Sequence, residues 1–144
     1  MIVYTDLQSF ISGHPDYNIQ GYFDLLSQLT VCNPFDITNQ LRTIMSMGTI
    51  IVAISDNQII GSGTVIIEPK IIHGGQCVGH IEDIVVHSEW RGHGIAKTIV
   101  QMLYEYAVSK NCYKTILDCS TSVSGLYESC GFIVSGVQLR RSIQ

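Results

Sequence analysis

Charge is scarce in this sequence, and long apolar runs are absent. Charged residues make up 14% of the 144 residues, and the eight basic ones are scattered along a chain of net charge −4. Nucleic acids and anionic membrane surfaces attract clustered positive charge, so we expect neither as a partner. Apolar runs such as residues 50–54 are far shorter than the roughly 20 residues that span a membrane.

Cysteine pairs of the C-x-x-C type are also missing. The five cysteines are Cys32, Cys77, Cys112, Cys119 and Cys130. An odd number of this kind fits reduced thiols in the cytosol. No Cys/His spacing typical of zinc sites occurs, and His80-Ile81-Glu82 matches only half of the zinc-deaminase signature, because no P-C-x-x-C accompanies it. The first ten residues lack the basic and apolar regions of a signal peptide. We therefore expect no bound metal and a cytoplasmic location.

What is present indicates one globular domain. Apolar residues make up 46% of the sequence, and a chain of this length buries about 68–70% of its unfolded surface. No repeat, linker or low-complexity segment divides the chain. We therefore expect a single domain over residues 1–144.

Apolar periodicity predicts an α/β fold with a mixed sheet. The expected strands are residues 2–5, 49–55, 59–67, 81–86, 113–119 and 132–139, and the expected helices are 19–29, 36–48, 95–111 and 123–130. Hairpins come early in this order and crossover connections come late. Helices on both faces of a mixed sheet fit this order better than a doubly wound parallel sheet.

The segment 79–98 contains the first sign of function. Ile81 and residues 84–86 supply β-branched strand residues, residues 91–94 break the pattern, and a helical period begins at Ile95. A strand that runs through a glycine turn into a helix places backbone N–H groups at a helix N-terminus, which attracts anions. The sequence therefore predicts a phosphate-bearing ligand at this turn.

Three glycine patterns compete for this turn, beside an ordinary β–α turn without function. A Walker A loop fails because Arg91 and Ala96 occupy its glycine positions. A dinucleotide fingerprint fails because Lys97 occupies its third glycine position. The third pattern, [RQ]-x-x-G-x-[GA], is fully matched by RGHGIA at residues 91–96. This is the pyrophosphate loop of the GNAT superfamily of N-acetyltransferases.

Other segments of the sequence narrow the resemblance to one family within this superfamily. Residues 70–73, 79–84, 112–114, 116–119 and 127–132 closely resemble the glucosamine 6-phosphate N-acetyltransferase family within that superfamily. The match covers about residues 67–137, and the N-terminal half resembles the family weakly. The resemblance implies a GNAT-type fold, with a twisted, mostly antiparallel sheet and a splayed, bulged strand at the acetyl-CoA site. It also implies a homodimer with entwined C-terminal strands.

The resemblance also implies direct attack of the 2-amine of glucosamine 6-phosphate on acetyl-CoA, so that no cysteine acts as a nucleophile. The backbone of Ile84, Val85 and Val86 would pair with the pantetheine. Tyr127 would donate its phenol proton to the CoA sulfur, a role that suits a group titrating near ~10. The residues implied to hold the pyrophosphate are Arg91, Gly92, His93, Gly94, Ile95, Ala96 and Lys97.

The remaining implied residues serve the sugar. Catalytic roles fall to Asp118, Glu82 and Asp83, although adjacent strand residues alternate faces, so both carboxylates reach one pocket only if the strand bulges. The other implied substrate-binding residues are Thr30, Lys70, Ile71, Ile72, His73, Tyr113, Lys114 and Arg140. Lysine suits a phosphate as a point charge.

The pattern departs from the family at two places. Val123 lies near the position of a CoA-binding asparagine, and Ser142 occupies the position of a phosphate-binding arginine. Arg140 shares a strand face with Ser142 and is favoured over Arg141 as its replacement. These departures leave two alternatives open: a GNAT-fold enzyme for another small or protein amine, and a non-catalytic acyl-CoA-binding module.

Overall fold

A five-stranded sheet, with its strands in the order β1-β2-β3-β4-β5, forms the centre of the molecule. The computed structural model describes residues 1–143. The strands are β1 (Val3–Asp6), β2 (Gly48–Ser55), β3 (Gln58–Pro69), β4 (Cys77–Val86) and β5 (Cys112–Ile116). The α-helices are α1 (Leu7–Gly13), α2 (Gln20–Leu26), α3 (Thr38–Met47), α4 (Ile95–Ser109) and α5 (Ser124–Glu128), and the short 3₁₀ turns are η1 (His73–Gly75), η2 (Ser88–Trp90) and η3 (Thr121–Val123).

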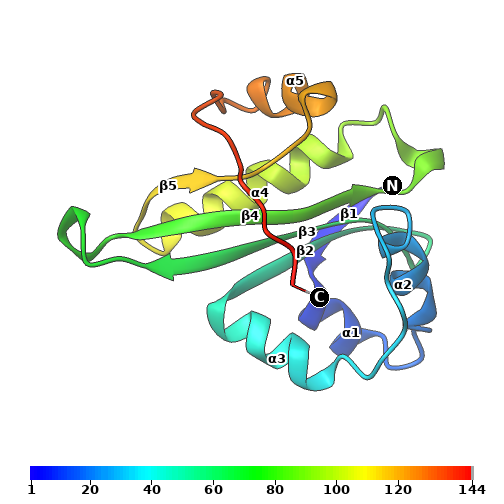
Figure 1. Ribbon diagram of the computed structural model, residues 1–144. Helices are drawn as coiled ribbons and strands as arrows, with labels where there is room; N and C mark the ends of the chain where they lie inside the picture. The colour runs from blue at the N-terminus through cyan, green and yellow to red at the C-terminus, as the bar shows by residue number, and fades with distance from the viewer. Residues whose placement is uncertain (144) are drawn as a thin grey trace.

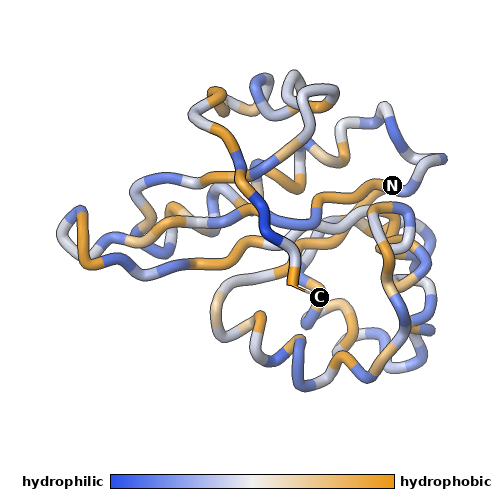
Figure 2. The backbone as a smooth tube through the Cα atoms, viewed as in Figure 1, coloured by the Kyte–Doolittle hydropathy of each residue, from blue (hydrophilic) through white to orange (hydrophobic). Residues whose placement is uncertain are grey.

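Helices cover both faces of this sheet. In Figure 1, α1, α2 and α3 lie on one face, and α4 and α5 lie on the other. Each face has its own apolar cluster, one around Leu25 and Val52 and one around Ile99 and Leu103. The hydrophobic stretches in Figure 2 follow the strands in the middle of the molecule. All eight residues of β2 are buried for this reason.

The pairing of the strands is mixed, as the order of elements predicts. The pairs β1–β2, β2–β3 and β3–β4 are antiparallel, whereas β4–β5 is parallel. Asp56 and Asn57 make the tight β2–β3 turn with φ of 48° and 60°, which is the left-handed backbone that a two-residue hairpin requires. The expected mixed, mostly antiparallel sheet is confirmed.

A bulge interrupts β4 where it passes β3. Glu82 pairs with Thr64 and Val85 pairs with Ser62, so Asp83 and Ile84 together face the single residue Gly63. Asp83 has a φ of 54°, a strained conformation for a residue with a side chain. A Cβ at position 63 would lie 2.5 Å from Cδ1 of Ile84, so glycine makes room for the bulged strand.

The parallel strands β4 and β5 separate beside this bulge. Their pairing ends at His80 and Ile116, although β4 continues to Val86. Beyond Ile116 the chain leaves the sheet toward η3 and α5 (Figure 1). Among residues 1–143, no strand pairs with this side of β4 after His80. The splayed, bulged strand is therefore present.

Both ends of the chain differ from expectation. The segment 7–13 forms α1, where no element was expected, and Asp6 caps its N-terminus by accepting a 2.8 Å hydrogen bond from the Ser9 N–H. The expected strand 132–139 forms no strand. Its residues alternate in polarity, but the segment crosses β4 on its way from α5 instead of running alongside a free strand edge (Figure 1). Side chains such as Val137 and Leu139 are 90% and 91% exposed instead.

Several element boundaries also differ from expectation. β5 ends at Ile116 instead of residue 119, because the chain turns away from β4 there. α2 ends at Leu26 rather than residue 29, and α5 spans only Ser124–Glu128. Within residues 1–143, no helix combines the length and the apolar character needed to cross a membrane.

Candidate functional site at the splayed strands

Three carboxylates gather where β4 bulges. Glu82 and Asp83 are neighbours on β4, and Asp118 follows the end of β5. Burial raises the pKa of the Glu82 carboxyl, and the negative charges of Asp83 and Asp118 raise it further, while His80 opposes them. The fold therefore places the Glu82 carboxyl within range of the negative charges of Asp83 and Asp118.

Asp118 has a partner from the C-terminal segment. Gln138 donates a 3.1 Å hydrogen bond from Nε2 to Oδ2 of Asp118. Figure 1 shows this segment running from α5 across β4 toward the face that carries α1 and α3. Arg140 lies two residues beyond Gln138 and is exposed. The segment therefore contacts Asp118 through Gln138 and continues to Arg140.

A group of aromatic and basic side chains lies beside these carboxylates. The His73 and Tyr113 rings stack with centroids 3.9 Å apart, and Nζ of Lys114 lies 5.5 Å from the Tyr113 centroid. Lys70 forms a 2.5 Å ion pair with Glu68, which holds the pKa of the lysine above its ordinary value. We call Lys70, His73, Tyr113 and Lys114 the basic cluster.

Glu68 connects the basic cluster to β4. Its Oε1 lies 3.2 Å from Nε2 of His80. His80 and Glu82 are two residues apart on a strand, so they share a face and their Cα atoms are separated by roughly 7 Å. The basic cluster and the carboxylates are thus neighbouring parts of one surface. Ile71 and Ile72 are exposed next to it.

The turn before α4 has the geometry of an anion site. Gly92 and Gly94 have φ of 82° and 75°, which glycine adopts without strain. A Cβ at either glycine would meet no atom of residues 1–143 within 4 Å, so the turn is open to solvent. The first N–H groups of α4 have no partner within the helix. Arg91 folds back, and its Nε donates a 3.3 Å hydrogen bond to the Val86 carbonyl.

Tyr127 lies on α5. It packs against the apolar cluster of the α4 face, and its ring meets Phe132 edge-on at 6.2 Å. Burial raises the pKa of the Tyr127 phenol, and Cys119 and Cys130 add to the effect. The hydroxyl is therefore protonated at neutral pH and available as a hydrogen-bond donor.

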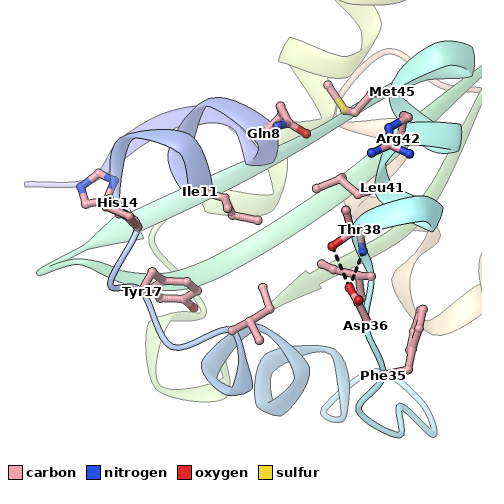
Figure 3. A pocket seen from close by; sticks show the side chains of 13 residues that line it. Gln8, Ile11, His14, Tyr17, Phe35, Asp36, Thr38, Leu41, Arg42 and Met45 are labelled. Atoms are coloured by element: carbon pink, nitrogen blue, oxygen red, sulfur yellow. Dashed lines mark hydrogen bonds between the residues drawn. The ribbon is translucent and has the colours of Figure 1, made fainter.

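Two hollows complete the surface. One of about 460 Å³ lies between the first turns of α4 and the end of α5, with Lys97 and Cys130 in its lining. The other, of about 590 Å³, lies between α1, α3 and the loop before α2 (Figure 3). There the Asp36 carboxylate already accepts hydrogen bonds from the N–H and hydroxyl of Thr38. None of the implied site residues lines this larger hollow.

Sequence reasoning missed Glu68, Gln138 and the buried pair Tyr22–Ser62. The Tyr22 hydroxyl forms a 2.9 Å hydrogen bond with the Ser62 hydroxyl. Ser62 of β3 pairs with Val85 of β4 beside the bulge. Burial raises the pKa of Tyr22 to about 12. Of these contacts, only that of Glu68 had a local signal, because Lys70 follows it two residues later, just after the end of β3. Within the described residues, no group of three His, Cys, Asp or Glu side chains could hold a metal ion.

We expect replacement of the Glu82 carboxylate to stabilise the protein at neutral pH. Because the folded-state pKa of Glu82 is raised, the ionised side chain is destabilising, and the proton-linked stability is lost as pH rises through that pKa. Glu82→Gln should raise Tm at pH 7, and the gain should vanish below pH ~4, where glutamate is protonated in both states. Thermal unfolding at the two pH values measures this.

Glu68→Gln provides a control of opposite sign. Lys70 and then His80 hold the pKa of Glu68 below its ordinary value, so its stabilisation is present above that ordinary value and is lost as pH falls. This variant should lower Tm slightly at pH 7 and leave it unchanged in acid. A lower Tm for Glu82→Gln at pH 7 would contradict the proposed crowding of carboxylates.

Known proteins resemble both the sequence and the fold. Residues 19–132 match the model of the acetyltransferase (GNAT) family. A probable glucosamine 6-phosphate N-acetyltransferase 2 from Oryza sativa subsp. japonica is 35% identical over 130 residues, which cover 83% of this chain and 78% of the relative. A glucosamine 6-phosphate N-acetyltransferase from Trypanosoma brucei brucei is 34% identical over 129 residues, which cover 85% and 88%.

A solved structure extends the similarity to the whole chain. The crystal structure of glucosamine-6-phosphate N-acetyltransferase from Arabidopsis thaliana superposes with a TM-score of 0.90 at 31% sequence identity. The superposition covers 100% of this chain and 99% of that chain. The similarity thus includes the N-terminal helices, where sequence motifs are weak.

Proposed function

The chain belongs to the acetyltransferase (GNAT) family, and we propose that it transfers the acetyl group of acetyl-CoA to the 2-amine of D-glucosamine 6-phosphate. The products are N-acetylglucosamine 6-phosphate and CoA, in the synthesis of activated amino sugars. The observation that carries the proposal is the basic cluster beside the three carboxylates, which suits a substrate with a phosphate at one end and an amine at the other. The names of the similar proteins support it.

Acetyl-CoA would bind along the splayed side of β4. The edge of β4 that β5 leaves unpaired offers backbone groups of Ile84, Val85 and Val86 to the pantetheine, as an added strand would use them. The open turn of residues 91–96 would receive the pyrophosphate on its N–H groups, and Lys97 adds positive charge at the neighbouring hollow. The thioester would then lie between the bulge and Tyr127.

The sugar would lie across the same surface. Lys70 and Lys114 would receive the phosphate, and the stacked pair His73–Tyr113 would support the sugar, with the backbone of residues 71–72 alongside. Thr30 and Arg140 would reach this substrate from the segments that follow α2 and α5. Asp118 would exchange its contact with Gln138 for one with the substrate.

The chemistry requires a neutral amine and a protonated leaving group. An amine of this type titrates near ~8, so a carboxylate of Glu82, Asp83 or Asp118 only has to accept a proton that is weakly held. The amine lone pair then forms the new C–N bond, and the C–S bond breaks. The Tyr127 phenol protonates the departing thiolate, and the proton of the amine eventually restores the phenol.

The exposed apolar residues of the C-terminal segment support a homodimer. Val137 and Leu139 are 90% and 91% exposed, and Ile143 is 99% exposed. Apolar patches of this kind mark surfaces that another chain covers. Pairing of this segment with its copy in a second chain would supply the strand partner that it lacks in the single chain. Arg140 would then reach the partner's sugar site.

An acceptor screen tests the proposed function. Release of free thiol from acetyl-CoA is followed with glucosamine 6-phosphate, with glucosamine and with a peptide amine. We expect kcat/KM for the phosphorylated sugar to exceed that for glucosamine by at least about a hundredfold, because two charge-assisted contacts to phosphate contribute about 1.5–3 kcal/mol each. Turnover of the peptide amine alone would make the chain a protein acetyltransferase, and CoA binding without turnover would make it a binding module.

Lys70→Met sharpens this screen. The variant should lose about tenfold in kcat/KM for glucosamine 6-phosphate and almost nothing for glucosamine, because only the phosphorylated sugar uses the ammonium. Lys110→Met is the control, since Lys110 lies over the Tyr106 ring of α4, 5.3 Å from its centroid. An equal loss for both sugars would remove Lys70 from the phosphate site.

A further inference from the structure

One long-range hydrogen bond connects the acetyl-CoA side of the site with the sugar side. The Ser88 N–H donates to Oε1 of Gln28 over 2.9 Å, between residues that are 60 positions apart in the chain. Gln28 follows the end of α2, and Ser88 begins η2. No role of Gln28 is suggested by the sequence motifs, because it belongs to neither the pyrophosphate loop nor the sugar segments.

On the sugar side, this bond is accepted by Gln28, which belongs to a short segment after α2. Thr30 lies two residues beyond Gln28, and its N–H donates to the Leu26 carbonyl over 3.2 Å. The Gln28 N–H donates to the Leu25 carbonyl over 3.0 Å. Residues 27–30 therefore continue the course of α2 as a single turn. Beyond Thr30, residues 31–37 form no helix or strand.

On the acetyl-CoA side, the backbone around Ser88 is held in place by bonds that do not involve Gln28. The His87 N–H donates to the Ile60 carbonyl over 2.8 Å, and the Trp90 N–H donates to the His87 carbonyl over 2.8 Å. Arg91 adds its bond to the Val86 carbonyl. The frame of η2 is thus anchored to β3 and β4. The Ser88 N–H, at the start of a helical turn, has no partner within that turn, and Gln28 supplies one.

We infer that Gln28 is a positioning residue, which holds the Thr30 segment at a fixed place relative to the acetyl-CoA turn. This inference rests on the proposed function, in which Thr30 contacts the sugar and the turn holds the donor. The exposed segment loses its tie to the rigid frame when the bond is removed, whereas the turn keeps its own bonds. Loss of the bond therefore weakens acceptor binding and leaves donor binding intact.

Gln28→Met tests this directly, because methionine has similar length and lacks the amide oxygen. A neutral, exposed hydrogen bond contributes modestly, so we expect KM for glucosamine 6-phosphate to rise about three- to tenfold. We expect kcat to change by no more than about twofold. KM for acetyl-CoA and Tm should stay at their wild-type values, which a general loss of structure would not allow.

Two matched variants control the experiment. Gln28→Glu keeps an acceptor oxygen in place and should restore the KM for the sugar to near wild type. Gln20→Met removes another amide from the exposed side of α2, where Nε2 of Gln20 donates to Asp24 over 2.9 Å, and should behave as wild type. A wild-type KM in Gln28→Met, or the same defect in Gln28→Glu, would overturn the inference.

Hydrogen exchange separates this inference from the proposed function. Amides of residues 28–33 should exchange faster in Gln28→Met than in wild type, with no change at residues 92–98, whether or not any amine is acetylated. Unchanged exchange at residues 28–33 would overturn the inference. If the wild-type protein does not acetylate glucosamine 6-phosphate but the variant shows this change in exchange, the proposed substrate is wrong. The positioning of residues 28–33 by Gln28 is then still supported.

Discussion

Tyr127→Phe should lower kcat about a hundredfold and leave both KM values within about twofold of wild type. The negative charge on sulfur appears only in the transition state, so loss of its proton donor affects kcat rather than binding. The ring itself stays, because phenylalanine keeps the edge-on contact with Phe132 and the packing against the α4 face. Steady-state kinetics with both substrates varied separates the two constants.

The pH dependence adds a second test of Tyr127. Burial raises the pKa of its phenol above the ordinary value, so wild-type kcat should decline only above pH ~10, where the phenol loses its proton. The variant should lack this alkaline decline. Tyr104→Phe is the matched control, because Tyr104 is exposed on α4. An unchanged kcat in Tyr127→Phe would remove this residue from the mechanism.

Gly48→Ala should lower the free energy of unfolding by about 3 kcal/mol, the upper part of the range for forced overpacking. A Cβ at position 48 would lie 1.8 Å from the Val65 carbonyl oxygen and 2.8 Å from the Val65 carbonyl carbon. Both atoms belong to the backbone of β3, which pairs with Gly48 through Ile66. The strands must therefore move apart, since no flexible side chain can yield.

Gly13→Ala is the matched control for this substitution. A Cβ at position 13 would meet no atom of the described residues within 4 Å, and alanine in a helix is favoured over glycine by about 0.5–1 kcal/mol. Urea unfolding should therefore show a loss for Gly48→Ala and a neutral or positive change for Gly13→Ala. A loss below about 1 kcal/mol at position 48 would contradict the close approach of β2 and β3.

The strand, turn and helix of residues 79–98 were predictable because their signals are local. β-branched residues, two glycines and a helical period suffice to place this unit. The bulge at Asp83 was not predictable from residue spacing alone. It depends on Gly63 of another strand making room for Ile84, a packing relation that no local pattern contains.

The basic cluster also depends on contacts between distant segments, which no local pattern predicts. Lys70 and His73 precede β4, whereas Tyr113 and Lys114 belong to β5. The pairing of Cys77 with Cys112 brings the two segments together, and only the resemblance to a family suggested that they share a site. Glu68 and Gln138 escaped notice because their partners lie on other parts of the chain.

The failed strand at residues 132–139 has an equally physical cause. Alternating polarity predicts which face of a strand is buried, but a strand forms only where a neighbour offers backbone partners. In the described chain this segment crosses β4 instead of running alongside a free strand edge, so its backbone has no strand partner (Figure 1). The α1 helix is the opposite case, since local signals for it were present and were overlooked. Asp6 is a good N-cap, and Leu7 and Phe10 are buried at helical spacing.

Identification of the product tests the central claim most directly. The protein is incubated with acetyl-CoA labelled with ¹³C at the carbonyl and with equimolar glucosamine 6-phosphate, glucosamine and a lysine-containing peptide, and the labelled product is assigned by NMR. We expect one new amide carbonyl, attached to the C2 nitrogen of the sugar phosphate, with the other two amines almost unlabelled. Label on the peptide amine, or label that remains on CoA, would contradict it.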